Sequence, residues 1–404
     1  MTENKLRILQ VSNRVPYPLN EGGTIGIYNY TRGFSEAGCE VTLLAQSAKK
    51  HQINEEEAQK ELSKYATYHS YPIDTDVKIV PALLNLFTNK SYNVQRFFDP
   101  IFETALIQNL KGNNYDVIQI EGTFPALYSD IIFQNRKDAL VVLRQHNVEF
   151  QIWQRLAANE SNPIKRWYLQ LLADRLKSFE KLHLNQYDAL VPVTVDDGDL
   201  FQSMGCKVPV FPSPAGIDTD LWKPSEQEDP NTVYHIGSLE WLPNLEAIEW
   251  FINDVWPLVQ AKCPNVKFAV AGKGMPDEYR SMEVPGIEML GQVDSATDFV
   301  ADKSITVVPL KSGSGIRLKI LEAMSAGKLV ISTTIGAQGI TCTDGKDILI
   351  ADTPEEFCEA IIRATTDIEL VNHLKQNARK LILDNYSNQS VIRKLITFYK
   401  GLRK

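Results

Sequence analysis

Short runs of apolar, often β-branched residues recur along the whole chain and alternate with longer segments of helical periodicity. Each run is continuous, which is typical of a parallel strand buried on both faces of its sheet. Strands that alternate with helices predict an α/β fold whose ligand sites lie at the carboxyl ends of the strands. The expected strands lie at residues 6–11, 41–45, 115–120, 140–143, 189–193 and 208–211, and then at 232–236, 266–271, 287–290, 305–309 and 347–351.

The strand and helix pattern starts afresh after a polar, proline-flanked stretch at residues 223–231, KPSEQEDPN. A chain of 404 residues is too long for one ordinary hydrophobic core. We therefore predict two Rossmann-like, doubly wound domains, with the stretch as their linker. The first domain would cover residues 1–222 and the second residues 223–386.

Residues 312–333, SGSGIRLKILEAMSAGKLVIST, carry the clearest candidate site. A glycine-rich loop follows an apolar strand, a helix of about three turns comes next, and another strand ends the segment. Gly313 and Gly315 permit positive φ and close approach of the backbone to a ligand. The helix that they open presents unpaired N–H groups, so the segment predicts an anion site.

The polar side chains of that helix allow two interpretations. Lys319 and Glu322 are three residues apart and therefore neighbours on one helix face, and Arg317 falls in the first turn. They could form a surface ion pair beside a solvated arginine. A cation in the first turn opposes the helix dipole, however, which favours a bound anion as the reason for Arg317.

Two features of the first half also lie where strands end. Gly22 and Gly23 stand between a strand and a helical pattern, where either a turn or a phosphate would require glycine. His146 follows the strand at residues 140–143. A lone histidine is more often structural, but this position favours contact with a ligand.

The sequence EAMSAG at residues 322–327 resembles the signature of the retaining nucleotide-sugar glycosyltransferases of family 4. The whole segment is most similar to the subgroup with the motif GxGxRLKxLEAM. Two departures stand out. Ser314 occupies the place of the first acid of the family's paired-glutamate motif, and Leu329 follows Lys328 where a proline is usual.

This resemblance implies the GT-B fold, in which two Rossmann-like domains face each other across a cleft. The first domain would hold the acceptor and the second the nucleotide-sugar donor, while residues 387–404 would cross back to the first domain. It also implies retaining transfer without a metal or a cofactor. The co-substrate would be a UDP- or GDP-linked sugar. Because such enzymes read the base with backbone groups, the side chains do not identify the base.

The resemblance assigns roles residue by residue. Relatives hold the donor pyrophosphate with an arginine and a lysine in the first loop of the second domain, but this chain has Ser238 and residues 243–244 there. Arg317 and Lys319 would supply these cations instead, and His146 would contact the donor sugar. The expected donor-binding residues are Gly22, Gly23, Gly237, Lys273, Val293, Gly313, Ser314, Gly315, Ile316 and Glu322.

Composition and charge limit the possible partners and location of the protein. A net charge of −8 argues against nucleic acid, and five scattered cysteines are typical of a reduced, cytoplasmic protein. Since no apolar run is long enough to span a bilayer, we expect at most peripheral contact with the inner face of the cell membrane. The apolar segment 80–98 and the basic helix at 163–185 could provide that contact, an acceptor surface or ordinary helix packing.

Several functions remain open. The acceptor could be a glycan, a lipid-linked sugar or a small molecule, in the synthesis of polysaccharide or glycoconjugate. Because Ser314 replaces an acid, a non-catalytic nucleotide-sugar sensor or partner subunit is the alternative, as is a GT-B sugar-nucleotide epimerase. Asp218 and Asp220 are interpreted as turn-capping residues, so no metal site is expected.

Overall fold

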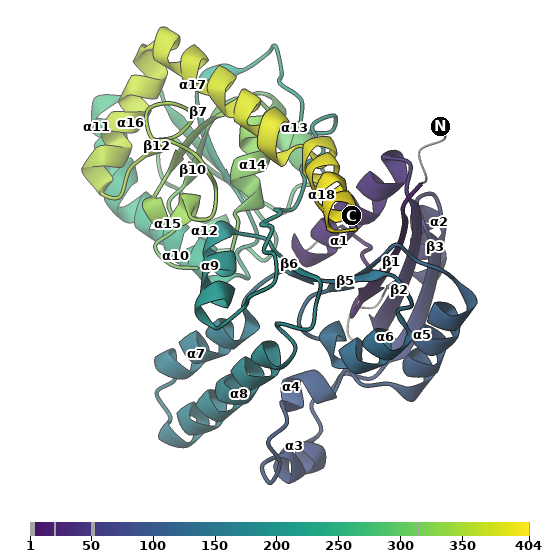
Figure 1. Ribbon diagram of the computed structural model, residues 1–404. Helices are drawn as coiled ribbons and strands as arrows, with labels where there is room; N and C mark the ends of the chain where they lie inside the picture. Colours follow the sequence, from purple (N-terminus) through teal and green to yellow (C-terminus); the bar gives the residue numbers. More distant parts are fainter. Residues whose placement is uncertain (1–4, 20–21, 50–52, 314, 404) are drawn as a thin grey trace. The chain divides into compact units, whose positions relative to one another are not determined.

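A computed structural model describes residues 5–19, 22–49, 53–313 and 315–403. The chain forms two compact units, each built on its own six-stranded sheet (Figure 1). The first unit comprises residues 1–216 and 391–404, and the second comprises residues 217–390. From the sequence we placed this division at residues 222 and 223.

The first unit carries a parallel sheet in the order β3-β2-β1-β4-β5-β6. Its strands are β1 (Arg7–Ser12), β2 (Glu40–Ala48), β3 (Thr67–Ile73), β4 (Val117–Glu121), β5 (Leu140–Gln145) and β6 (Ala189–Pro192). Its helices are α1 (Gly22–Glu36), α2 (Glu55–Leu62), α3 (Ile79–Asn85), α4 (Tyr92–Gln95), α5 (Pro100–Gly112), α6 (Ser129–Asn135), α7 (Glu149–Asn159), α8 (Pro163–Leu182) and α9 (Val195–Ser203), with a 3₁₀ turn at Pro125–Tyr128.

The second unit repeats this topology in the order β12-β11-β10-β7-β8-β9. Its strands are β7 (Asp229–Ile236), β8 (Lys267–Ala271), β9 (Ile287–Gly291), β10 (Lys303–Val308), β11 (Leu329–Ser332) and β12 (Leu349–Ile350). Its helices are α10 (Leu242–Trp250), α11 (Trp256–Lys262), α12 (Asp277–Arg280), α13 (Ala296–Ala301), α14 (Leu318–Ser325), α15 (Thr334–Ala337), α16 (Pro354–Thr366) and α17 (Ile368–Leu381), with π turns at Phe251–Val255 and Ile382–Tyr386.

The expected fold class, two doubly wound parallel sheets, is therefore confirmed. Every residue of β4 (VIQIE) and of β10 (KSITVV) is buried, the polar ones included, as expected for strands covered on both faces. In each sheet the strand order reverses beside the first strand, between β1 and β4 and between β7 and β10. Loops diverge at such a switch point, which is where ligands bind in open α/β sheets.

Four local predictions were wrong. Residues 208–211 form only an isolated bridge, because Pro209 cannot donate to a sheet ladder. From the sequence, residues 243–261 are expected to form one helix, but a π turn interrupts it before Pro257, which lacks the N–H of a regular helical hydrogen bond. Residues 223–231 are no linker, since β7 begins within them. Helix α14 starts only at Leu318, so Arg317 lies just outside it as the N-cap.

The last helix, α18 (Asn388–Leu402), packs against the first unit beside α1 (Figure 1). Its buried residues Val391, Ile392 and Leu395 share one hydrophobic cluster with Ile8 of β1. The Tyr399 hydroxyl also donates a hydrogen bond to Gln119 Oε1 over 2.6 Å. None of the described helices combines the length and the apolar composition that a membrane span requires.

Candidate functional site

Lys319, in the first turn of α14, lies at the centre of the side chains gathered at the strand ends of the second unit. Its Nζ is 3.2 Å from Nε2 of His235, near the end of β7, and 3.0 Å from Oδ1 of Asn244 in α10. These contacts join the first loop of the unit to the glycine-rich segment. The ammonium hydrogen-bonds to these two acceptors rather than to Glu322. The surface ion pair between Lys319 and Glu322, one of the two interpretations of the sequence, therefore does not form.

His235 is fully buried, and its two ring nitrogens have different roles. Nδ1 lies 2.9 Å from the carbonyl oxygen of Val307 in β10, which can only accept a hydrogen bond. We therefore assign the ring proton to Nδ1, which leaves the lone pair of Nε2 facing Lys319. Burial and the charge of Lys319 hold the pKa of His235 well below its usual value, so the ring is a neutral acceptor.

Asn244 fixes the other side of the ammonium. Its Nδ2 donates to the carbonyl oxygen of Ser238 over 2.7 Å, so its Oδ1 is the atom turned toward Lys319. The sequence alone predicts no role for His235 or Asn244. The signals were present, because His235 ends an apolar strand and Asn244 opens a helix, but neither residue type is specific enough by itself.

Burial and nearby charges shift the ionisation of Lys319 and Glu322 toward neutrality. The pKa of Lys319 is lowered to about 7, first by burial and then by the Arg317 guanidinium. Burial also raises the pKa of Glu322 to about 7, against the opposing effect of Lys319. Both groups therefore titrate near neutral pH, which is common at sites where a ligand supplies the missing charge.

Glycines leave room for this arrangement. A Cβ at Gly237 would overlap the Lys319 ammonium and would lie 3.0 Å from Asn244 Nδ2. Gly313 has a φ of 123° and Gly315 a φ of 79°, values that favour glycine. Ser314, between them, lies outside the described residues. Gly313 and Gly315 thus adopt the positive φ that glycine permits, and the missing side chain of Gly237 leaves room for the Lys319 ammonium.

Arg317 is buried beside the glycine loop. Its Nη1 donates to the carbonyl oxygen of Gly315, and its Cζ lies 5.8 Å from the ring centroid of Trp241. Gly313 completes this group, since a Cβ there would lie 3.0 Å from both Arg317 Nη2 and Trp241 Cη2. The loops after β7 and β10 thus meet around two cationic side chains.

Three other predicted residues lie at neighbouring positions. Ile316 is half-buried and packs on the core beneath α14. Val293 follows β9 and packs against a smaller cluster that includes Tyr234. Lys273, after β8, is exposed, and its Nζ lies 3.5 Å from Glu240 Oε2. Lys273 therefore differs from Lys319 in having a carboxylate partner.

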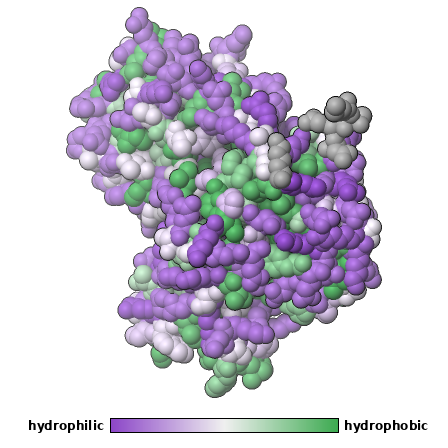
Figure 2. Space-filling view, in the orientation of Figure 1, coloured by the Kyte–Doolittle hydropathy of each residue, from purple (hydrophilic) through white to green (hydrophobic). Residues whose placement is uncertain are grey.

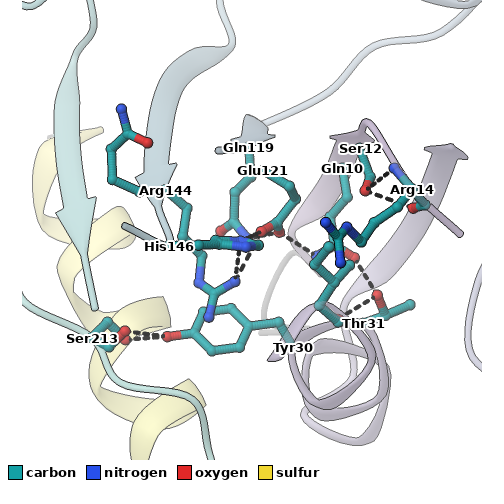
Figure 3. Close-up of polar contacts among 12 residues, drawn as sticks. Gln10, Ser12, Arg14, Tyr30, Thr31, Gln119, Glu121, Arg144, His146 and Ser213 are labelled. Carbon is teal, nitrogen blue, oxygen red and sulfur yellow. Dashed lines mark hydrogen bonds and ion pairs between the residues drawn. The ribbon is translucent and has the colours of Figure 1, made fainter. Parts of the chain in front are cut away.

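In the first unit, His146 belongs to a buried polar network at the ends of β4 and β5 (Figure 3). Its Nε2 is 2.9 Å from Glu121 Oε2 and 2.9 Å from Arg144 Nη1. The side chain of His146 is 20% exposed, whereas those of Glu121 and Arg144 are almost fully buried. The two charged groups thus hold one edge of the imidazole while part of the ring reaches the surface.

The charges within this network compensate each other. Burial alone would raise the pKa of Glu121, but Arg144 and His146 outweigh it and hold the value at about 2. The Arg144 guanidinium also stacks 3.6 Å from the ring centroid of Tyr30. Burial and the Arg144 charge lower the pKa of His146, so the imidazole is neutral at pH 7 and can donate or accept a hydrogen bond.

The glycine pair of the first unit begins α1. Gly22 is the first helical residue, and a Cβ at Gly23 would lie 3.2 Å from Nη1 of Arg14, which follows β1. An arginine, a close backbone and a helix N-terminus therefore meet at this strand end. Across the described residues, no three His, Cys, Asp or Glu side chains are grouped as a metal site requires.

Residues 230–367, all within the second unit, match the family Glycosyl transferases group 1. A protein of Klebsiella pneumoniae, named "Uncharacterized 44.6 kDa protein in cps region", is 25% identical over 401 residues, which cover 95% of this chain and 97% of that protein. One subunit of the phosphatidylinositol N-acetylglucosaminyltransferase of Arabidopsis thaliana is 27% identical over 198 residues, covering 47% of this chain and 43% of that protein.

Solved structures agree with the fold across nearly the whole chain. HepE of Anabaena, crystallised in complex with UDP, superposes with a TM-score of 0.67 at 13% identity, covering 98% of this chain and 100% of that one. Sucrose-phosphate synthase of Thermosynechococcus elongatus gives a TM-score of 0.65 at 14% identity, covering 98% and 99%. The fold is therefore GT-B, as predicted from the sequence.

Proposed function

We propose that this protein is a glycosyltransferase that moves a sugar from a nucleotide-sugar donor to an acceptor in polysaccharide or glycoconjugate synthesis. The observation that carries the proposal is Lys319, held by His235 and Asn244 beside Arg317 at the entrance to α14. Two cations at a glycine-rich strand end suit a diphosphate. These residues lie inside the segment that matches the group 1 glycosyltransferases.

The proposed chemistry places stabilising charge on the leaving group. The bond from the anomeric carbon to the donor phosphate breaks, the acceptor oxygen bonds to that carbon, and the acceptor proton passes to the phosphate oxygen. Arg317, Lys319 and the loop amides at 313–316 would stabilise the developing negative charge. One such preorganised donor contributes about 3 kcal/mol in other enzymes. We propose that the transfer retains the anomeric configuration and needs no metal, because the family that the sequence resembles works in this way.

The remaining roles concern recognition of the donor. Glu322 would accept hydrogen bonds from the two ribose hydroxyls, for which a carboxylate offers paired acceptors. Lys319 already donates to two acceptors, and an ammonium has a third N–H for a phosphate oxygen. We propose that His146, held neutral by its surroundings, contacts the donor sugar. Val293 and Lys273 would flank the base and the ribose or phosphate.

Nucleotide binding tests the role of Lys319. Because hydrogen bonds to charged groups are worth about 1.5–3 kcal/mol, Lys319→Met should weaken binding of the preferred nucleotide sugar by about ten- to hundredfold. Lys60→Met, an exposed position on α2, serves as the matched control. Calorimetric titration with UDP-, GDP- and dTDP-linked sugars measures the effect. Equal affinity in wild type and Lys319→Met would contradict the assignment.

Release of nucleotide from the donor distinguishes a transferase from a non-catalytic sensor or partner subunit. A transferase should release free nucleotide slowly from its donor even without an acceptor, and His146→Ala should slow this release while leaving nucleotide affinity within a few-fold. A non-catalytic sensor or partner subunit is favoured by Ser314, which stands where relatives carry an acid. That alternative predicts tight binding without any release of nucleotide.

A further inference from the structure

The first unit exposes a cluster of large apolar side chains on and around α3. Six of them, between 55% and 90% exposed, lie within eleven consecutive residues, and Phe87 is the most exposed. They form the apolar tip, defined here as residues 77–90. Figure 2 shows apolar surface at the end of this unit where Figure 1 labels α3. Its exposed apolar members are Val77, Ile79, Val80, Leu83, Leu84 and Phe87.

The apolar tip is held in place by specific contacts. Arg175 of α8 donates to the backbone carbonyls of Asn85 over 2.9 Å and Leu86 over 3.0 Å, and to the Asn85 side chain over 2.8 Å. The Tyr92 hydroxyl accepts from the amide of Lys78 over 2.9 Å. Exposure of these apolar side chains is therefore a feature of the fold. Apolar clusters on monomers of this kind mark contact surfaces.

The start of α8, in the same unit, also exposes apolar side chains. Helix α4, which follows the apolar tip, packs against α8. Ile164 and Trp167 in the first turns of α8 are 79% and 59% exposed. Lys165 and Arg166 between them are also exposed. Tryptophan and basic residues beside aliphatic ones are typical of surfaces that lie in a membrane interface.

Charge distinguishes this surface from the rest of the chain. The chain carries a net charge of −8, yet residues 77–98 and 161–173 contain no aspartate or glutamate. Lys78 pairs with Asp74 over 3.0 Å and Lys165 with Glu160 over 2.5 Å, and all four residues lie toward solvent or at its edge. Such ion pairs are weak and exchange readily for other anions.

We propose that the apolar tip and the start of α8 dock on the surface of a bilayer that contains anionic lipids. The aliphatic side chains and Phe87 would enter the boundary between headgroups and acyl chains, while Lys90, Lys165 and Arg166 would contact lipid phosphates. This inference goes beyond the proposed function, since it depends on the exposed surface alone. It would bring the protein to membrane-bound acceptors.

Vesicle sedimentation tests the proposal with the full chain. The protein should sediment with vesicles of phosphatidylcholine and phosphatidylglycerol, less with phosphatidylcholine alone, and less as salt increases. The double variant Leu84→Asp/Phe87→Asp should bind at least about tenfold more weakly, because it places charge in the apolar layer. Ile368→Asp, an equally exposed position in the second unit, should bind like the wild type.

Charge-reversal variants and nucleotide titration separate membrane binding from donor binding. Lys90→Glu/Arg166→Glu should reduce binding to the anionic vesicles and leave weak binding to phosphatidylcholine unchanged. Nucleotide affinity should stay the same in all these variants, so the surface and the donor site are tested separately. The proposal is overturned if the wild type ignores both vesicles, if Ile368→Asp loses as much binding, or if the apolar tip instead forms a dimer that these variants abolish.

Discussion

At the residue scale, the charge of Lys319 depends on what surrounds its ammonium. His235 and Asn244 are neutral acceptors, while burial and then the charge of Arg317 lower the pKa of Lys319. Neutral acceptors orient the ammonium and leave its charge in place, whereas a carboxylate would cancel that charge. Lys273 shows the contrast, because Glu240 lies beside it. Arg317 affects the pKa of Lys319 more than the opposing charge of Glu322 does, and we propose that the resulting positive charge suits this strand end to a diphosphate.

Gly237→Ala should weaken nucleotide binding by about tenfold or more, because the added Cβ would displace the Lys319 ammonium from two charge-assisted hydrogen bonds. Gly112→Ala is the matched control, since a Cβ there meets nothing within 4 Å. Titration with UDP-glucose, a ligand of HepE, and circular dichroism of both variants measure binding and folding. A folded Gly237→Ala protein with wild-type affinity would contradict the geometry.

Affinity for the preferred nucleotide sugar should fall as pH rises from about 6 to about 9, because Lys319 loses its proton near pH 7 while both donor phosphates stay ionised. Binding above pH 7 should take up a proton, which calorimetry in two buffers of different ionisation enthalpy detects. Glu322 titrates in the same range, so the deciding variant is Lys319→Arg, whose guanidinium stays charged. Its affinity should lose the fall with pH that Lys319 causes, and any pH dependence that stays would belong to Glu322.

At the element scale, the glycine-rich segment positions its cations through the point at which α14 begins. Arg317 has φ −85° and ψ 93°, outside the helical region, so its side chain turns back to Gly315 and Trp241. Lys319, inside the first turn, faces β7 instead. A helix that began earlier would place both on the helix surface, as the periodicity alone suggested.

Helix α18 should contribute strongly to the stability of the first unit. Leu395→Ala removes a fully buried side chain and should cost about 2–5 kcal/mol, whereas exposed Arg393→Ala should cost under about 0.5 kcal/mol. Tyr399→Phe should cost about 1 kcal/mol, because Gln119 Oε1 loses its donor. Calorimetric unfolding measures these shifts, and similar melting for Leu395→Ala and Arg393→Ala would contradict the packing.

At the scale of the whole molecule, the two units differ in what they bring to the proposed reaction. The second unit carries His235, Asn244, Arg317 and Lys319, together with the matched family segment. The first unit carries the His146 network and the apolar tip. Each unit has its own sheet and its own hydrophobic clusters, so the proposed role of each unit can be tested by substitutions in that unit alone.

Residues 217–390 should fold alone and bind the preferred nucleotide sugar within about tenfold of the full chain, since a unit with its own core is an independent folding unit. Its ends already meet, because the Ile217 amide donates to the Tyr386 carbonyl over 2.7 Å and the Asn388 amide donates to the Ile217 carbonyl over 3.0 Å. Circular dichroism and titration measure both properties. Lys319→Met should weaken binding to the fragment by the same factor of about ten to one hundred as in the full chain. An unfolded fragment would contradict the division.

The sequence by itself determined the alternation of strands and helices, because burial on both faces of a parallel sheet requires continuous apolar runs. It also placed Gly237, His146 and the segment of Arg317 and Lys319 at strand ends, where topology brings ligands. Strand ends fix position along the chain, but they leave the partners of a side chain undefined. The structure alone supplied those partners.

Only the tertiary structure decided that Lys319 is held by His235, 84 residues away, and that the His235 ring is oriented by Val307. The pairing of β7 with β10 brings these residues together, with Tyr234 opposite Thr306. Periodicity is a local property of the chain, whereas such contacts depend on which strands become neighbours. The exposed apolar tip follows the same rule, because a sequence pattern shows which residues are apolar and only packing shows which are left uncovered.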